Sequence, residues 1–301
     1  MPRRITIKRT IYFYKIKFLD NHGNPVDPLP LFTFIDRLPF AYPGRYYKRV
    51  DQSLLSMHVD NLTDPISFQL GLTRMDALPM IDDRGTLNPL LLPTNTSGLY
   101  EPFHATLFSN NILGAEYNYF GPRIGNLVLY LKDKLNHSVR DVVLINLVRP
   151  DLYTLLNNLS EIKVFTLEIP RQNVGITGEL HSNLQSGFEN MAACSDADNI
   201  QVRICNTSNR DPDIQLPFKD RLAEFVMHRR NEIKNLRLKA REFESEVFKD
   251  YNLLDYFMYS KKEVIKEEAA GRHVQSQDMY RAIQDAYNEF IDEINRILDV
   301  T

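Results

Sequence analysis

The residues best suited to chemistry lie in one short stretch of the sequence. His104 and Glu116 occupy two apolar, strand-like segments, Phe103–Phe108 and Ile112–Phe120, on either side of a turn at Asn110. Such segments around a short turn that contains Asn predict a β-hairpin. His104 lies six residues before Asn110, and Glu116 lies six residues after it. We therefore expect the two side chains to be cross-strand neighbours on the same face of the hairpin.

A histidine beside a carboxylate can act as a general base that the carboxylate orients. Arg123 follows the Gly121-Pro122 break, at the start of an amphipathic segment, and its guanidinium could hold an anion. His104, Glu116 and Arg123 are thus candidate catalytic residues of a hydrolase or nuclease-like effector. The alternative is an ordinary polar pair on the open face of a sheet, with Arg123 near it by accident.

Other catalytic signatures are missing from the sequence. It contains no nucleophile elbow around a serine, no H-x-x-x-H or C-x-x-C spacing, and no glycine-rich nucleotide-binding loop. We therefore expect no metal and no cofactor. The sequence alone does not decide whether the chain is an enzyme.

Two basic segments could contact phosphates. One surrounds the tyrosine pair at positions 46 and 47, and the other is the predicted strand Ile233–Arg241, whose alternate cations share a face, with the end of the helix before it. Cations on one face can follow a phosphate backbone. The alternatives are cations that extend from an exposed strand, or lysines that protect an edge strand from aggregation. The candidate nucleic-acid-binding residues are Arg45, Lys48, Arg49, Arg229, Arg230, Arg237, Lys239 and Arg241.

The elements that must position these residues predict an α+β or mixed α/β fold. Up to about Ser138 the sequence has mostly short strands, which predict a largely antiparallel β domain over residues 1–138, with the hairpin and an irregular loop at 75–98. The continuous apolar strand Val142–Val148 then begins an alternation of strands and helices, which predicts a second, α/β domain over residues 139–301. Strands of the two domains could also pair into one sheet.

The second domain is expected to end in a long helix over residues 277–299. Apolar residues recur along it at alternating steps of three and four, as in a coiled-coil seam. They are Tyr280, Ile283, Tyr287, Phe290, Ile294 and Ile297. We expect this stripe to dock on the second domain of its own chain. Docking on a second copy, which would give a homo-oligomer, is the alternative.

Composition limits the class of protein. The 301 residues are 43% hydrophobic and 25% charged, with a formal net charge of -3, which is typical of a globular protein without bulk attraction to nucleic acid or anionic membranes. Cys194 and Cys205 lie in segments with core-like patterns, so we expect buried free thiols in a reducing compartment. No signal-peptide pattern is present, and no apolar run approaches the ~18 residues that span a bilayer. We expect a cytoplasmic protein with no membrane partner.

The hairpin end Glu116–Arg123, the strand Ile233–Arg241 and the acidic terminal helix resemble those of uncharacterised bacterial proteins associated with mobile elements and anti-phage defence loci. The resemblance implies a cytoplasmic setting and a role linked to nucleic acid or to a partner, and it assigns no catalytic residue. Two functions of different classes follow. One is an intracellular sensor or interaction module that binds nucleic acid or a protein partner through a basic face. Such a module could belong to an antiviral (anti-phage) defence system. The other is the hydrolase or nuclease-like effector.

Overall fold

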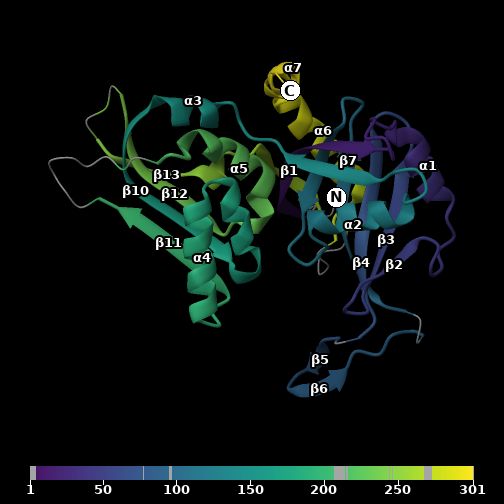
Figure 1. Cartoon of the computed structure of the whole chain (residues 1–301). Helices are drawn as coiled ribbons and strands as arrows, with labels where there is room; N and C mark the ends of the chain where they lie inside the picture. The colour runs from purple at the N-terminus through teal and green to yellow at the C-terminus, as the bar shows by residue number, and fades with distance from the viewer. Residues whose placement is uncertain are drawn as a thin grey trace. The chain divides into compact units, whose positions relative to one another are not determined.

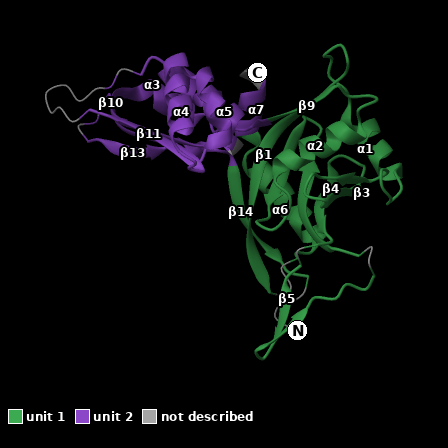
Figure 2. Cartoon of the chain, turned by 60° about the horizontal axis from the view of Figure 1, so that its bottom comes forward, with its two compact units in different colours: residues 1–144, 259–292 green, residues 145–258, 293–301 purple. Residues whose placement is uncertain are grey.

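The computed structural model describes residues 5–76, 78–94, 97–206, 214, 216–243, 245, 247–267 and 273–300. The chain has an α+β fold with mostly antiparallel sheets, as the sequence predicted (Figure 1). It divides into two compact units. Unit 1 comprises Met1–Leu144 and Tyr259–Asp292, and unit 2 comprises Ile145–Met258 and Glu293–Thr301 (Figure 2, green and purple).

The division differs from a simple split at Ser138. The chain passes from unit 1 to unit 2 at Leu144, within strand β9 (Asp141–Asn146), and returns to unit 1 at Tyr259. The returning segment adds strand β14 (Tyr259–Ile265) to the sheet of unit 1 by pairing with β1 (Thr6–Leu19). Local patterns cannot reveal this return, because the pairing joins segments at opposite ends of the chain.

The sheet of unit 1 follows the order β14-β1-β8-β7-β4-β3-β2, and β9 also pairs with β1. Its other strands are β2 (Tyr46–Lys48), β3 (Leu54–Asn61), β4 (Ile66–Arg74), β7 (Leu99–Leu107) and β8 (Ile112–Tyr117). β7 and β8 form the predicted hairpin around Asn110. Their register pairs Thr106 with Gly114, which confirms the predicted turn centre.

Helices cover both faces of this sheet. Helices α1 (Pro28–Arg37) and α2 (Ile124–Lys134) share a core with Ala105 and Ala115, so they lie on one face. Helix α6 (Ser276–Glu289) packs against β7, β8 and β14. It lies on the opposite face, which also carries His104 and Glu116, because side chains alternate along a strand. The two residues therefore face a helix and not open solvent.

The expected irregular loop at 75–98 contains a small hairpin. Strands β5 (Met80–Asp83) and β6 (Thr86–Pro89) pair with each other in a separate two-stranded sheet, and all of their residues are exposed. Ala77 and residues 95–96 of the expected loop lie outside the described residues.

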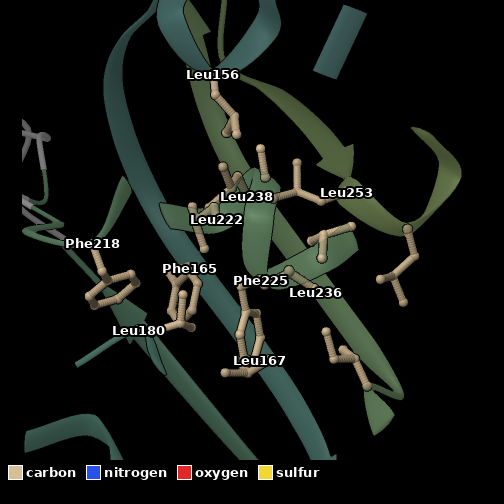
Figure 3. Close-up of a cluster of buried hydrophobic side chains, with 14 of the residues drawn as sticks. Leu156, Phe165, Leu167, Leu180, Phe218, Leu222, Phe225, Leu236, Leu238 and Leu253 are labelled. Atoms are coloured by element: carbon tan, nitrogen blue, oxygen red, sulfur yellow. The ribbon is translucent and has the colours of Figure 1, made fainter. Parts of the chain in front are cut away.

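Unit 2 is built on an antiparallel sheet with the order β11-β10-β12-β13. Its strands are β10 (Leu159–Pro170), β11 (Asn199–Cys205), β12 (Asn235–Glu242) and β13 (Lys249–Asn252). Helices α3 (Asp151–Asn158), α4 (Ser182–Cys194) and α5 (Leu222–Arg229) share one core with Phe165, Leu167 and Leu238 (Figure 3). All three helices therefore lie on one face of the sheet. Short 3₁₀ helices connect these elements: η1 (Arg171–Glu179), η2 (Lys219–Arg221), η3 (Arg230–Glu232) and η4 (Leu253–Tyr256).

Two consecutive helices, α6 and α7 (Ile291–Val300), occupy the predicted terminal helix, with Phe290 between them. The apolar stripe along α6 packs on unit 1. Ile283 is fully buried, and the ring of Tyr287 stacks on Phe108 with centroids 3.7 Å apart. Phe290 contacts Phe13 edge to face. These side chains therefore dock on their own chain, as predicted, but on unit 1 and not on the second domain.

The prediction of buried cysteines is wrong, since both thiols are free and exposed. Cys194 is the last residue of α4 and lies off the buried stripe of Phe188 and Ala192. Cys205 lies on the outward-facing side of β11, two residues after Arg203. Ile200 lies on the opposite, buried side of the strand. None of the helices in the described residues combines the length and the apolar character that crossing a membrane requires.

Candidate functional site

A buried polar pair lies at the centre of unit 1. His104 Nδ1 is 2.6 Å from Glu116 Oε2, and the backbone N–H of His104 donates to the same oxygen over 3.1 Å. Both side chains are almost completely buried. The β7–β8 register and this contact confirm that the two residues are cross-strand neighbours on one face.

The second carboxylate oxygen of Glu116 binds a cation that the sequence did not indicate. Arg9 Nε, from β1, lies 2.9 Å from Glu116 Oε1 in an ion pair. Ile11 is the cross-strand partner of Glu116, so Arg9 stands two residues along β1 on the same face. Glu116 therefore has partners on both oxygens, as a buried carboxylate requires.

The other ring nitrogen of His104 contacts helix α6. His104 Nε2 lies 3.1 Å from the hydroxyl oxygen of Ser276, the first residue of α6. Gln69 of β4 donates to the same hydroxyl oxygen over 3.1 Å and to Asp60 over 2.9 Å. A chain of polar contacts thus runs from Glu116 in the core through His104, Ser276 and Gln69 to the exposed carboxylate of Asp60.

Tyr280 closes the outer end of this network. Its hydroxyl donates to Asp60 Oδ2, and its ring meets that of His104 at an angle of 75°. Burial, followed by the hydrogen bond to the Asp60 carboxylate, raises the pKa of Tyr280 far above its usual value. The neutral phenol is therefore a permanent donor in this site.

The hydrogen-bond partners fix the tautomer of a neutral His104 ring. Because Glu116 is an acceptor, His104 Nδ1 carries the proton that lies between them. In the neutral imidazole Nε2 is then an acceptor, and Ser276 donates its hydroxyl proton to it. Gln69 completes the arrangement, because its amide can only donate to the Ser276 oxygen.

Arg123 lies elsewhere in unit 1. Its guanidinium contacts the rings of Tyr117 and Tyr119, at 5.0 Å and 5.5 Å from their centroids, and donates to the backbone oxygen of Asn118. No contact among the described residues joins it to His104 or Glu116. Arg9, and not Arg123, is therefore the cation of this site.

Two of the three candidate phosphate-binding residues of unit 1, Arg45 and Arg49, have structural partners. Arg45 is buried, donates to the carbonyl oxygens of Asp36 and Leu38, and lies over the ring of Phe40. Its guanidinium is therefore bound inside the protein. Arg49 forms an ion pair with Asp51, and Lys48 is exposed.

The candidates at the end of α5 are also paired. Arg229 binds the carboxylates of Glu179 and Glu232, and these hydrogen bonds raise its pKa further. Arg230 lies over the ring of Phe257. α5 packs on the helix-covered face of the unit 2 sheet, so these cations do not share a surface with those of β12.

The opposite face of the unit 2 sheet carries cations that pair with none of the described residues. Leu236, Leu238 and Ala240 are buried under the helices, so Arg237, Lys239 and Arg241 share the other face, as predicted. Arg203 of β11 lies in the same cross-strand row as Arg237, because Thr166 of β10 pairs with both. Among the described residues, no side-chain hydrogen bond or ion pair engages Arg203, Arg237 or Lys239. Arg241 pairs with Glu161.

Several site residues escaped the sequence analysis for identifiable reasons. Ser276 directly precedes the predicted terminal helix, and nothing in the sequence connects it with His104, which lies 172 residues away. Arg9 and Gln69 belong to strands whose positions relative to the hairpin follow only from the sheet order. Arg203 was the one accessible to pattern reading, since it alternates with Val202 and Ile204 along a predicted strand.

Comparison with known proteins adds no functional assignment. No protein-family model matches the chain, and a search of curated proteins found no similar one. Among the described residues, no cluster of three or more His, Cys, Asp or Glu side chains could hold a metal ion. Function must therefore be argued from the buried polar site of unit 1 and from the cationic sheet face of unit 2.

Proposed function

We propose that the chain is an interaction module that binds single-stranded nucleic acid through the face of the unit 2 sheet opposite α3, α4 and α5. The observation that carries this proposal is a set of cations on that face that pair with none of the described residues, namely Arg203, Arg237 and Lys239. An unpaired cation on an accessible strand is ready to contact phosphate, because no internal ion pair must first be broken.

Aromatic side chains at the connection between β12 and β13 support a single-stranded ligand. The cationic groups of Lys163 and Arg241 lie 5.6 Å and 5.4 Å from the ring centroid of Phe248. Phe243, which follows β12, is 74% exposed. Bases of a single strand stack on such rings, while the backbone follows neighbouring cations. Antiparallel sheets with one open face are a common platform for this kind of recognition.

The face is not uniformly basic. Glu168 and Asp250 stand on it beside the cations, and Glu161 neutralises Arg241. The formal net charge of the chain is also negative, at -3. We therefore expect moderate affinity that rests on a few local contacts and not on the overall charge.

The resemblance to proteins of mobile elements and anti-phage defence loci supports a bacterial sensor role for such a module. In this setting the bound strand would be a signal, and unit 1 would serve a separate task. A module that recognises a protein partner through the same face is the competing function.

The experiment is a fluorescence-anisotropy titration of the full chain with labelled single-stranded and double-stranded DNA and RNA. We expect binding of single strands. In the double variant Arg203→Gln/Arg237→Gln the affinity should fall at least about tenfold, because two phosphate contacts are lost. Absence of binding by the wild type would refute the proposal and favour a protein partner.

The matched control is the double variant Arg171→Gln/Arg229→Gln. It removes the same charge from unit 2, but from arginines that already pair with Asp196 and Glu179. We expect its affinity to stay close to that of the wild type. An equal loss in both double variants would show that net charge, and not this face, controls binding.

A further inference from the structure

We infer that Ser276, His104 and Glu116 form a second functional site, a hydrolytic centre for carboxylic esters with Ser276 as the nucleophile. This inference lies beyond the nucleic-acid interface and does not depend on it, since all three residues belong to unit 1. It replaces the nuclease-like centre that the sequence suggested, because Ser276 joins the site and Arg123 does not.

The distances fit a nucleophile, a base and an orienting carboxylate. Ser276 Oγ lies 3.1 Å from His104 Nε2, and His104 Nδ1 lies 2.6 Å from Glu116 Oε2. Both contacts fall within hydrogen-bond reach, and the base stands between its two partners as nucleophilic catalysis requires. The chain order is histidine, glutamate, serine, and such constellations are defined by geometry and not by sequence order.

The contacts that other residues make with Glu116 and Ser276 prepare His104 to accept a proton. Arg9 and the backbone N–H of His104 fix the Glu116 carboxylate in one position. The carboxylate in turn holds the proton on Nδ1 and leaves the Nε2 lone pair directed at Ser276. Gln69 donates to Ser276 Oγ, so the only hydroxyl proton of Ser276 is left to point at His104.

Ser276 stands where a helix can stabilise negative charge. It is the first residue of α6, and the preceding residue, Gln275, makes no side-chain capping hydrogen bond. The first-turn N–H groups of a helix have no partner within the helix and carry the positive end of its dipole. Such N–H groups can bind the oxyanion of a tetrahedral intermediate beside the nucleophile.

Charges near Ser276 select the class of substrate. Asp60 is joined to Ser276 through Gln69, whereas Asp278, in the same turn of α6, pairs with Arg281. The Asp60 carboxylate disfavours a phosphodiester, which carries its own negative charge. A carboxylic ester with a neutral or cationic leaving alcohol meets no such repulsion. Ester cleavage, and not nucleic-acid cleavage, is therefore the reaction of this site.

The reaction balances with water as the only co-substrate. Ser276 Oγ forms a bond to the ester carbonyl carbon while His104 Nε2 takes its proton. The bond between this carbon and the alcohol oxygen then breaks, and His104 returns the proton to the departing alcohol. Water attacks the acyl-serine in the same way, releases the carboxylic acid and restores Ser276.

The first test uses a fluorophosphonate probe and 4-nitrophenyl acetate with the full-length chain. We expect the probe to attach covalently to the peptide that contains Ser276, and both labelling and ester hydrolysis to disappear in Ser276→Ala. The control is Ser182→Ala, because Ser182 is likewise the first residue of a helix, α4. Labelling should persist in that variant. A folded wild type that stays unlabelled at Ser276 would overturn the inference.

A second test measures activation of the nucleophile directly. In Ser276→Cys, the base at 3.1 Å should lower the pKa of the new thiol and speed its alkylation by iodoacetamide at least tenfold over that in Ser182→Cys. Peptide mass spectrometry separates both thiols from the exposed Cys194 and Cys205. Equal alkylation rates would show that His104 does not act on this position and would overturn the inference.

Glu116 acts through His104 and is therefore a positioning residue. We expect Glu116→Gln to slow labelling of Ser276 at least tenfold, and Glu116→Asp, which keeps the carboxylate, to recover part of the rate. Both variants are compared at a temperature where near-ultraviolet circular dichroism shows them folded. Equal labelling rates in the two variants would assign Glu116 a purely structural role.

Discussion

Ile283 of α6 fills the space in which a side chain at Gly114 of β8 would lie. A Cβ atom built on Gly114 would stand 2.6 Å from Ile283 Cγ2 and 3.1 Å from Phe13 Cε1. The absence of a side chain at this position is what lets α6 approach the hairpin. The same approach brings Ser276 within reach of His104.

Gly114→Ala should therefore destabilise unit 1. The added methyl group forces Ile283 and α6 away from the sheet, and overpacking of this kind costs about 1–3 kcal/mol of unfolding free energy. Urea unfolding measures the difference. Gly125→Ala is the control, because a Cβ there meets no atom within 4 Å and Gly125 lies in a helix. That variant should gain up to about 1 kcal/mol. A Gly114→Ala variant as stable as the wild type would contradict the packing of α6 on β8.

Glu116→Gln should lower the unfolding free energy by about 3 kcal/mol, because it breaks a buried ion pair from one side. The Arg9 cation then loses the carboxylate that it contacts, with only 12% of its side chain exposed to water. Glu289→Gln makes the same change in the exposed pair with Lys262. Exposed pairs contribute less than about 1 kcal/mol, so this control should unfold close to the wild type. Similar losses in both variants would argue against a special stabilising role of the buried pair.

Some of this arrangement could be read from the sequence because it depends on neighbouring residues. The turn at Asn110 fixes the register of its hairpin, and the register places His104 opposite Glu116. The alternation in β12 likewise places Arg237 and Lys239 on one face. The second conclusion needs only the two-residue period of a strand, and the first adds the position of the turn.

Other parts depend on contacts that no local pattern encodes. Arg45 stands in a basic, tyrosine-containing segment, yet it is buried because the carbonyl groups at the end of α1 require donors. Ser276 meets His104 only because β14 returns to β1 and leads the chain into α6. The cations of a sequence segment therefore indicate a binding surface only after their internal partners are known.

Stability at alkaline pH should depend on Tyr251. Burial, together with the hydrogen bond that its hydroxyl donates to Glu242, raises the pKa of Tyr251 to about 12. Because an unfolded tyrosine ionises near pH 10, the stabilising effect is complete below about pH 10 and is lost as the pH rises through about 12. Tyr251→Phe should lose less stability than the wild type across this range. Urea unfolding at both ends of the range measures it, and equal losses would show that Tyr251 does not contribute.

The salt dependence of binding should report how many cations of the unit 2 face contact phosphate. For single strands, the logarithm of the affinity falls with the logarithm of salt concentration by about 0.7 for each phosphate contact. If Arg203, Arg237 and Lys239 each make one contact, the slope is about -2. Arg237→Gln should reduce it by about 0.7, because one contact is lost. Arg229→Gln should leave it unchanged, since Glu179 and Glu232 already hold that guanidinium. Anisotropy titrations across a salt series give the slopes. An unchanged slope in Arg237→Gln would exclude this arginine from the interface, whereas a slope reduced in both variants would indicate a longer path for the strand across unit 2.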